Sequence, residues 1–440
     1  MALMTTSFLH HTNEVILDLP PHTQVYAPNY PVPDGSAAAL VLKAVRAPIG
    51  CPSLAACLAT RRRGEVVIVV SDVTRPISYA TFLPELLGEV EAAGVARSEV
   101  LLLITTGMHR PGTPAERRAM FGEHVVARYR IEDHRAEDES NLAAVPGRST
   151  SGAAIRLNRR FVEAGFRLIT GLVEPHFMAG FSGGRKAICP GLASLDSVRN
   201  FHGPAFMADP RSCNGNLADN PLHAESLSVA QLCSPNFTLN VVLDRSRRIV
   251  RAFAGELESA HAAACDFVRD CACPVVTQPA DVVVTSSGGY PLDGTFYQCV
   301  KGFVSCLPAL RPGGTLIAFG GCSEGVGGPE YHSLMRRWAG RWQDFLADIR
   351  LPGVFTKDQW QLQMHTRALE KVGVENLHFV SDALPAATLA ELSVTGHPAA
   401  PGCIGEILGE LVRRALEPGG TLAVFPEGPY CAPLEKAPHG

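Results

Sequence analysis

Two histidines follow β-rich segments at the point where each predicted strand ends. His109 comes shortly after residues 100–104, and His176 comes shortly after residues 166–173. Neutral imidazole can accept or release a proton near physiological pH. A lone histidine is more often structural than catalytic, but two histidines in equivalent loops favour an acid–base pair. Such a pair could work on opposite faces of one substrate and remove a proton from either enantiomer.

A third β-rich segment, residues 66–70, runs into Asp72 and Arg75. The planar guanidinium of an arginine can form two parallel hydrogen bonds with a carboxylate, so Arg75 is a candidate for binding an acidic substrate. The alternative is an ion pair between Arg75 and Asp72. Asp72 could also bind a ribose or orient a neighbouring side chain, and these roles are compatible.

A glycine-rich segment, residues 179–186, ends in Lys186. It is not a Walker A loop, because Arg185 stands where glycine is required and Ala187 replaces serine or threonine. Glycines such as Gly183 and Gly184, which follow Ser182, can still let backbone amides approach a phosphate. Lys186 is then either a phosphate contact or a point of covalent attachment. An ordinary surface loop explains the segment equally well.

His202 has no partner at the spacing of a known metal-binding motif. The sequence contains no His-Glu-x-x-His and no Cys-x-x-Cys, which are the common local signatures of metal sites. A metal bound by His202 would therefore need most of its ligands from a small molecule. Taken alone, His202 is better explained as a surface histidine.

In the second half of the chain, Tyr297, Gln298 and Lys301 lie at the start of a predicted helix, after the glycine-rich segment 287–293. Backbone amides at a helix N-terminus attract anions, and a lysine one turn further adds positive charge. The alternative is an ordinary helix start with an exposed lysine.

The elements that carry these residues alternate between β-rich and amphipathic segments, which predicts an α/β fold with mainly parallel sheets flanked by helices. We expect strands at residues 66–70, 100–104, 166–173, 281–285, 315–319, 377–380 and 421–425, and helices at residues 82–93, 296–310, 331–349, 357–372 and 404–416.

The composition becomes loop-like near residues 274–280 before this alternation resumes. We therefore predict two domains, an N-terminal domain at residues 1–275 with the main catalytic side chains and a C-terminal domain at residues 276–440 that closes over them. The last residues could return to the first domain. Because ligands bind beyond the carboxyl ends of parallel strands, we expect the active site in the cleft between the domains.

Composition and charge exclude several classes of protein. The 440 residues are 46% apolar and 19% charged with a formal charge of −4, which is typical of a globular protein and does not indicate nucleic-acid binding. No apolar run is long enough to span a membrane, and residues 1–13 do not resemble a signal peptide. We expect a cytoplasmic protein whose 13 cysteines are reduced.

At these residues the sequence resembles the lactate racemase family, whose members carry a nickel-pincer nucleotide, pyridinium-3,5-bisthiocarboxylic acid mononucleotide. The resemblance covers nearly the whole chain and includes several independent motifs in the family's order. The matching segments are residues 71–76, 106–111, 174–191 (EPHFMAGFSGGRKAICPG), 202, 215–225, 240–243, 254–256, 260–261 and 289–301.

The resemblance implies a role for each candidate residue. Lys186 would hold the cofactor through a covalent thioamide, and His202 would bind nickel, whose other ligands come from the pincer. His109 and His176 would be the alternating acid and base. The remaining site residues would bind the cofactor (Asp72, Ser182, Gly183, Gly184, Tyr297, Gln298) or the substrate (Arg75, Gln298, Lys301).

The implied reaction inverts C2 of a small, lactate-like 2-hydroxy acid by reversible hydride transfer to the cofactor, which separate biosynthetic enzymes would supply. Three segments depart from the family pattern, at Ser78, at residues 293–295 and at residues 133–135. These departures leave the substrate open, and a sugar-acid epimerase or a racemase of malate or an aryl-lactate is an alternative. A metal-dependent hydrolase and a non-catalytic cofactor carrier are alternatives from other classes, and the oligomeric state stays open.

Overall fold

The first sheet carries most of the candidate residues. In the computed structural model, which describes residues 3–435, its six strands lie in the order β13-β12-β9-β4-β5-β6. Only the edge pair β12–β13 is antiparallel. The bounds are Val66–Ser71 (β4), Val100–Thr105 (β5), Arg130–Asp133 (β6), Phe166–Leu172 (β9), Phe237–Leu243 (β12) and Ile249–Gly255 (β13). The predicted strands at residues 66–70, 100–104 and 166–173 are confirmed.

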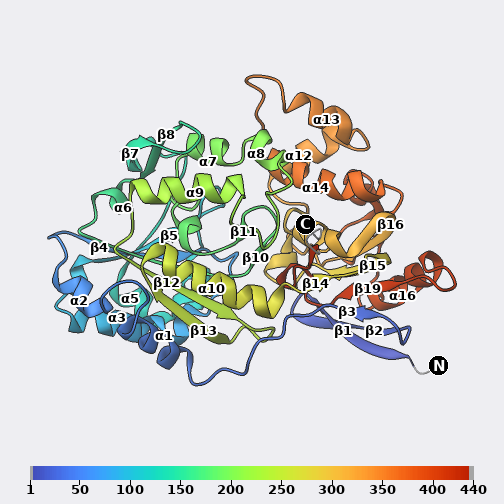
Figure 1. Ribbon diagram of the computed structural model, residues 1–440. Helices are drawn as coiled ribbons and strands as arrows, with labels where there is room; N and C mark the ends of the chain where they lie inside the picture. The colour runs from blue at the N-terminus through green and yellow to red at the C-terminus, as the bar shows by residue number, and fades with distance from the viewer. Residues whose placement is uncertain (1–2, 436–440) are drawn as a thin grey trace.

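Helices cover both faces of this sheet, as a parallel sheet with continuous apolar strands requires. On one face β4 and β5 pack against α1 (Ala37–Arg46), α2 (Leu54–Ala59), α3 (Leu83–Ala92) and α5 (Glu123–Arg128). The other face lies under α6 (Arg159–Glu163), α7 (Leu195–Phe201) and α9 (Pro221–Leu232). Figure 1 shows these two layers below and above the strands. Further helices are α4 (Pro114–Phe121), α8 (Pro204–Ala208) and α10 (Leu257–Ala272), which lies against β12 and β13.

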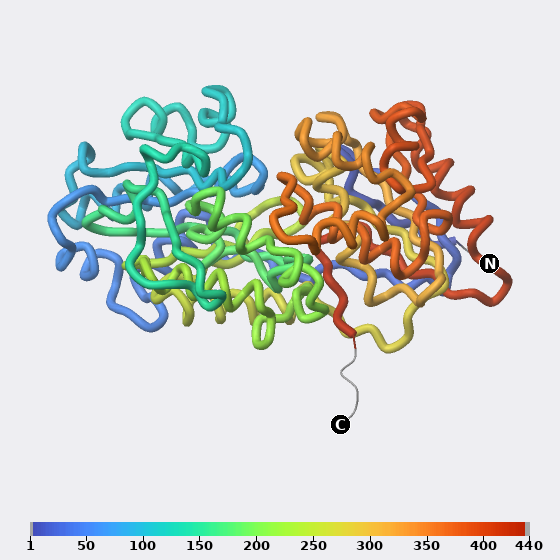
Figure 2. Tube along the Cα trace, turned by 90° about the horizontal axis from the view of Figure 1, so that it is seen from above, coloured from blue at the N-terminus to red at the C-terminus, as the bar shows by residue number. Residues whose placement is uncertain are grey.

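The second sheet has the order β18-β17-β16-β15-β19-β3, and all its neighbouring strands are parallel. Its bounds are Gln24–Val25 (β3), Ala280–Ser286 (β15), Leu310–Phe319 (β16), Leu377–Ser381 (β17), Thr395–Pro398 (β18) and Leu422–Phe425 (β19). The molecule therefore has two α/β units, which lie side by side in Figure 2.

Helices α11 (Phe296–Ser305), α12 (Pro329–Trp338) and α14 (Gln359–Val372) pack on one face of the second sheet. Two predicted helices are shorter than expected. Residues 331–349 divide into α12 and α13 (Trp342–Asp348), because Gly340 between them takes a left-handed φ of 68°. The helix predicted at 296–310 ends at Ser305, and Pro308 lies in a 3-10 turn before β16.

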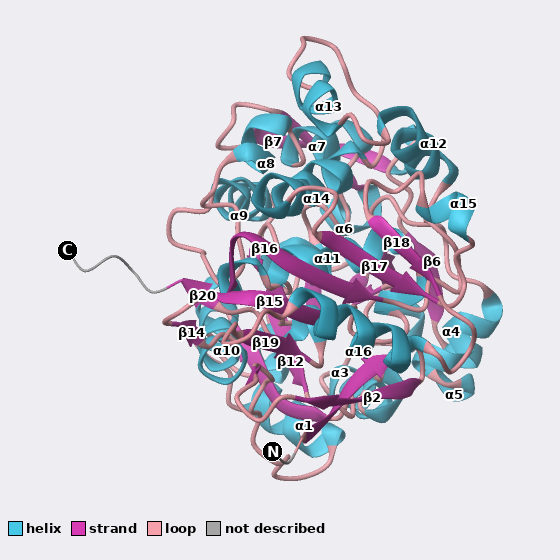
Figure 3. Ribbon diagram, turned by 90° about the vertical axis from the view of Figure 1, so that its right-hand side faces the viewer, coloured by secondary structure: helices cyan, strands magenta, loops and turns pink. Residues whose placement is uncertain are grey.

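Residues 4–25 lie with the second sheet, although residues 1–275 were predicted as one domain. β1 (Met4–His10) and β2 (Asn13–Leu19) form a hairpin that packs with α16 (Ile404–Ala415) on the face opposite α11, as seen from the side in Figure 3. β3 extends the second sheet by pairing with β19. The hairpin and α16 together cover apolar side chains of β15 and β16, and the N-terminal sequence itself does not indicate this contact.

Three small two-stranded sheets complete the fold. β7 (Leu142–Arg148) pairs with β8 (Ala154–Asn158), and β10 (Pro175–His176) pairs with β11 (Gly180–Phe181). β14 (Val275–Val276) pairs with β20 (Leu434–Glu435), so the end of the described chain lies beside the junction between the two units. α15 (Ala386–Leu389) is the last short helix. Among residues 3–435, no helix has the length and apolar character needed to cross a membrane.

Candidate active site

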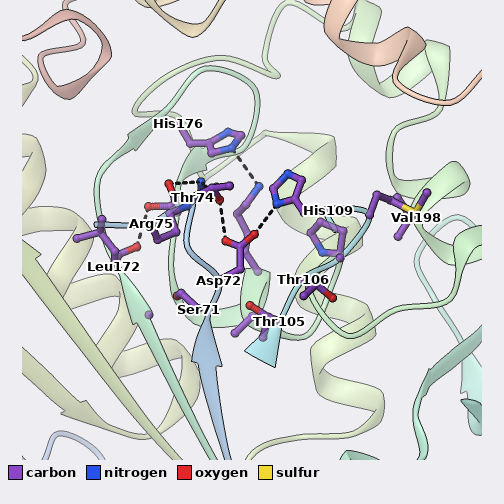
Figure 4. A pocket seen from close by; sticks show the side chains of 18 of the residues that line it. Ser71, Asp72, Thr74, Arg75, Thr105, Thr106, His109, Leu172, His176 and Val198 are labelled. Atoms are coloured by element: carbon purple, nitrogen blue, oxygen red, sulfur yellow. Dashed lines mark hydrogen bonds and ion pairs between the residues drawn. The ribbon is translucent and has the colours of Figure 1, made fainter. Parts of the chain in front are cut away.

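A cavity of about 170 Å³ lies beyond the carboxyl ends of β4, β5 and β9, where side chains from both α/β units meet. Figure 4 shows its part on the first unit, where Asp72, His109 and His176 converge from three separate strand-end loops. From the second unit the lining includes α11 and the start of α14. The predicted site residues in the lining are Asp72, Arg75, His109, His176, Ser182, Gly183, Lys186, His202, Tyr297, Gln298 and Lys301.

His109 and Asp72 are in direct contact at the wall of the cavity. The Nδ1 atom of His109 lies 2.6 Å from Oδ2 of Asp72, and Thr74 donates its hydroxyl to Oδ1 of Asp72 at 2.7 Å. Burial would raise the pKa of Asp72, but the charges of His109 and Arg75 outweigh burial and lower it. In the neutral form of the ring, Nδ1–H of His109 donates to the ionised carboxylate and the lone pair is on Nε2.

His176 is held differently, at the end of β10 just before the turn to β11. Its Nδ1 accepts hydrogen bonds from the backbone amides of Met178 and Ala179 at 3.4 and 3.3 Å, and Nε2 lies 3.3 Å from Nζ of Lys186. Burial, followed by the nearby charges of Lys186 and Lys301, holds the pKa of His176 well below its usual value. The imidazole is therefore neutral at physiological pH.

Lys186 is a buried amine in a positively charged surrounding. Burial, together with the guanidinium groups of Arg185 and Arg75, holds its pKa well below that of a free lysine. A neutral amine keeps the lone pair needed for attack on a carbonyl or thiocarbonyl carbon. Of the two roles considered for Lys186, covalent attachment fits these surroundings better than a phosphate contact, which needs a positive charge.

The glycines before Lys186 serve the packing of the loop. A Cβ atom on Gly184, which has a φ of 52°, would lie 2.6 Å from the ring of His261 on α10. The amide of Gly184 donates to Oδ1 of Asn240 at 3.0 Å and is not free for a phosphate. Ser182 donates its hydroxyl to the carbonyl of Leu172 at 2.7 Å. Gly184 itself lies outside the cavity lining.

His202 lies in the cavity wall and not on the surface. Its Nδ1–H donates to the carbonyl of Val198 at 3.0 Å, and its ring stacks on Trp360 with centroids 4.5 Å apart. Burial, with Lys186 nearby, lowers the pKa of His202 to about 3. A neutral histidine whose Nδ1–H is fixed by a backbone carbonyl presents Nε2 as a ligand, which is the usual arrangement of a metal-binding histidine.

The second unit contributes a wall of polar and aromatic side chains. The hydroxyl of Tyr297 accepts a hydrogen bond from Nε1 of Trp360 at 3.0 Å, and Oε1 of Gln298 is buried with no partner among residues 3–435. Burial and the charge of Arg75 lower the pKa of Lys301, so Lys301 is not the exposed lysine of the alternative interpretation.

Arg75 does not pair with Asp72 as considered from the sequence. Within the described residues its one carboxylate neighbour within 4.0 Å is Glu174, whose Oε1 lies 4.0 Å from Nε. Burial raises the pKa of Glu174. The guanidinium therefore has capacity left for a further anion in the cavity.

Sequence analysis did not identify Trp360, Asp358 or Glu174 as site residues. Trp360 and Asp358 lie at the start of α14 and line the cavity. The available signal was the position of a tryptophan, one of three in the chain, at a predicted helix start. That signal does not say which strand ends the helix will face.

Two family models match the chain. The model of the lactate racemase N-terminal domain matches residues 10–215, and that of the lactate racemase C-terminal domain matches residues 275–399. The chain belongs to the lactate racemase family. Lactate racemase of Thermoanaerobacterium thermosaccharolyticum is 37% identical over 332 residues, 75% of this chain and 76% of that protein. Lactate racemase of Lactiplantibacillus plantarum is 32% identical over 394 residues, 88% of this chain and 89% of that protein.

Solved structures agree with this assignment. The lactate racemase apoprotein from Thermoanaerobacterium thermosaccharolyticum superposes with a TM-score of 0.86 at 31% identity, covering 98% of this chain and 100% of that chain. A protein from Thermotoga maritima has a TM-score of 0.66 at 18% identity, covering 87% and 96%, and shows the fold alone. This member of the lactate racemase family is an isomerase with the two-unit α/β fold of the apoprotein.

Proposed function

We propose that this enzyme inverts the C2 configuration of a small, lactate-like 2-hydroxy acid and uses a covalently held nickel-pincer nucleotide. The observation that carries the proposal is that Lys186, His202, His109 and His176 come from separate segments and line one cavity. Cofactor attachment, a metal ligand and two acid–base groups are the parts that this chemistry needs. Enzymes that make the cofactor would load it.

The residues present fit the cofactor. Lys186 offers a buried amine whose pKa is held well below its usual value for a thioamide bond, and His202 offers an oriented Nε2 for nickel. Among the described residues Oε1 of Gln298 has no hydrogen-bond partner, so it is free to accept a hydrogen bond from a bound molecule. When bound, the cofactor supplies a reversible acceptor for the hydride at C2 of the substrate.

The protein would bind the substrate and move its hydroxyl proton. Arg75 and Lys301 provide positive charge for the carboxylate. Because Asp72 fixes Nδ1 of His109, its Nε2 can take the hydroxyl proton of one enantiomer and return it. His176 would act on the other side as the acid, because its neutral ring accepts backbone amides at Nδ1 and so carries its hydrogen on Nε2. The two enantiomers place the hydroxyl on different sides, so the roles of the two histidines exchange when the reaction runs in reverse. Tyr297 and Trp360 close the second wall and limit access of water.

A substrate deuterated at C2 tests this mechanism. With cofactor-loaded protein, the product of inverted configuration should keep its deuterium, because the hydride leaves and returns within the same site. Mass spectrometry and chiral chromatography measure both properties. Washout of deuterium into solvent would indicate carbanion chemistry and contradict the proposal, and incorporation of oxygen from labelled water would indicate the hydrolase.

One observation favours a larger 2-hydroxy acid as the second candidate. A groove of about 1000 Å³ adjoins the cavity and shares Asp72, His109, Tyr297 and Gln298 with it. Its lining contains several carboxylates as well as the basic side chains of Arg110, Arg135 and Lys357, and Arg110 already pairs with Glu116 at 2.6 Å. Loss of optical activity across lactate, malate, aryl-lactates and sugar acids would separate the candidates. A preference for a second carboxylate would indicate that these basic residues take part in binding.

A further inference from the structure

A cluster of histidines and carboxylates lies at the carboxyl end of the second sheet, and it shares no residue with the cavity of His202. His10 ends β1, His11 forms the hairpin turn, and Asp382 follows β17 directly. Asp293 lies in the turn after β15. The hairpin thus places two imidazoles beside the carboxyl ends of the parallel strands, where the polar residues that follow those strands come together.

The spacing of the side-chain atoms suits a small cation. Nε2 of His10 lies 3.2 Å from Oδ2 of Asp382, and Nε2 of His11 lies 3.8 Å from Oδ1 of the same carboxylate. One ligand atom from each of the three residues lies within 4.8 Å of the others. In a tetrahedral site with bonds of about 2.1 Å, ligand atoms are about 3.4 Å apart. Side-chain shifts of roughly 1 Å would therefore complete the site.

Buried atoms without partners indicate that a component is missing from this cluster. Nδ1 of His10, Oδ1 of Asp382 and Oδ1 of Asp293 are buried and lack a hydrogen-bond partner among the described residues. His10 is only 6% exposed and Asp293 is fully buried. An unsatisfied buried polar atom costs about 1–3 kcal/mol, so three in one cluster are unusual for a finished hydrogen-bond network.

Asp293 lies beside His10, where a small shift of either side chain would make it the carboxylate that commonly supports a metal-bound histidine. Its Oδ2 accepts hydrogen bonds from the amides of His11 at 2.7 Å and Gly321 at 3.3 Å, and it lies 3.8 Å from Nδ1 of His10. A histidine that binds metal through one nitrogen usually donates the other N–H to such a carboxylate.

The turn brings both rings to the same side. His11 has a φ of 50°, in the left-handed region, and its ring centroid lies 4.9 Å from that of His10. Adjacent residues of a regular strand would point to opposite faces. A Cβ atom on Gly321 would lie 2.3 Å from Nε2 of His11, so glycine is needed where the ring passes.

We propose that His10, His11 and Asp382 bind one divalent transition metal ion of the zinc class, with Asp293 positioning His10 and water as the fourth ligand. Two imidazoles and one carboxylate favour zinc or a similar ion over calcium or magnesium. The ion would tie the N-terminal hairpin to the end of β17 and so stabilise the second unit. The competing interpretation is a metal-free ion pair between His10 and Asp382.

The test uses the full chain produced without cofactor-making enzymes and carrying His202→Ala, so that the proposed nickel site cannot contribute. After chelation and equilibrium dialysis against zinc, elemental analysis should give about one zinc per chain. Added zinc should also raise the melting temperature, because the ion binds the folded state. His11→Ala and Asp382→Asn should lose both effects. His332→Ala is the matched control, since His332 also pairs with a carboxylate, Glu391 at 2.9 Å.

Zinc retained by His11→Ala and Asp382→Asn, or no zinc bound by the parent protein, would overturn the proposal. Circular dichroism and the zinc-free melting temperature establish that each variant is folded. A variant that has not folded is replaced by His11→Asn, which keeps a polar side chain in the turn without an imidazole. None of these readouts depends on racemisation, so failure here is distinct from failure of the proposed function.

Discussion

The Nδ1 atoms of the two cavity histidines have opposite surroundings. In His109 this atom contacts the carboxylate of Asp72, whereas in His176 it receives two backbone amide hydrogens. Both arrangements fix the ring and direct Nε2 into the cavity. The carboxylate selects a hydrogen on Nδ1 in His109, and the amides disfavour one in His176. The two proposed acid–base groups are therefore chemically distinct although they serve mirror-image substrates.

His109→Ala and His176→Ala should each lower the racemisation rate by about 10²–10⁴-fold, the usual contribution of general acid–base catalysis. Both directions should slow equally, because two enantiomers have the same free energy and a variant cannot shift their equilibrium. Initial rates from each pure enantiomer measure this. His332→Ala, on the surface of α12, should match the parent enzyme. Full activity in either cavity variant would remove that histidine from the mechanism.

At the scale of elements, the conformation of the glycine-rich loop is set by its contacts with β12 and α10. Gly183 has a φ of 75°, and a Cβ atom there would lie 2.7 Å from Val173 and 2.9 Å from Oδ1 of Asn240. The same Oδ1 atom of Asn240, on β12, accepts a hydrogen bond from the backbone amide of Gly184. The loop thus fixes Lys186 by packing against β12 and α10, and the glycines influence the cofactor indirectly.

Gly184→Ala should therefore prevent loading of Lys186. An alanine with a left-handed backbone conformation costs about 1–2 kcal/mol by itself. At Gly184 the added Cβ would also clash with the ring of His261. Intact-mass spectra of protein made with the cofactor enzymes should lose the nucleotide adduct, and the melting temperature should fall. Gly313→Ala is the control, because Gly313 has a φ of 70° but nothing within 4 Å of its added Cβ. An unchanged adduct in Gly184→Ala would show that the loop tolerates the shift.

At the scale of the whole molecule, the interior contains several neutral histidines. Burial lowers the pKa of His365 to about 3. Both ring nitrogens of His365 lie buried without partners within the described chain, between Phe296 and Phe303. Burial likewise lowers the pKa of His134 to about 4 and, with the charge of Arg185, that of His223 to about 3. Acid should therefore destabilise the fold well before most carboxylates are protonated.

The direction of this pH effect follows from the difference between the pKa of His365 in the folded and in the unfolded chain. The folded-state pKa of His365 is below its unfolded value of about 6.5, so the unfolded chain gains the proton first as pH falls. Its contribution to stability is complete above about pH 6.5 and declines down to about pH 3. Between about pH 7.5 and 5.0 the loss is about 2 kcal/mol for this residue.

His365→Phe should reduce that loss, because phenylalanine fits the aromatic cluster and does not titrate. Urea unfolding of both proteins at the two pH values measures the difference. Replacement of an exposed histidine, His22→Ala, should leave the pH dependence unchanged. Equal pH dependence in His365→Phe and the parent would mean that His365 is protonated in the fold.

The sequence by itself determined the α/β class, the core strands of both sheets, and the convergence of Asp72, His109 and His176 on one region. These conclusions hold because apolar runs mark buried parallel strands, and because such strands end at one edge of the sheet. Local patterns contain this information. The break of a predicted helix at Gly340 was within reach of the same reasoning, since glycine weakens helices.

Tertiary structure alone decided which distant segments meet. The hairpin at residues 4–19 packs on the second sheet, Trp360 stacks on His202, and Asp382 comes within reach of His10. These partners are separated by more than 150 residues, and of the three contacts the one between Trp360 and His202 depends on how the two units dock. Burial at that interface also holds the pKa of Lys186 well below its usual value and lowers that of His202 to about 3. No spacing within a segment encodes desolvation by a surface folded elsewhere in the chain.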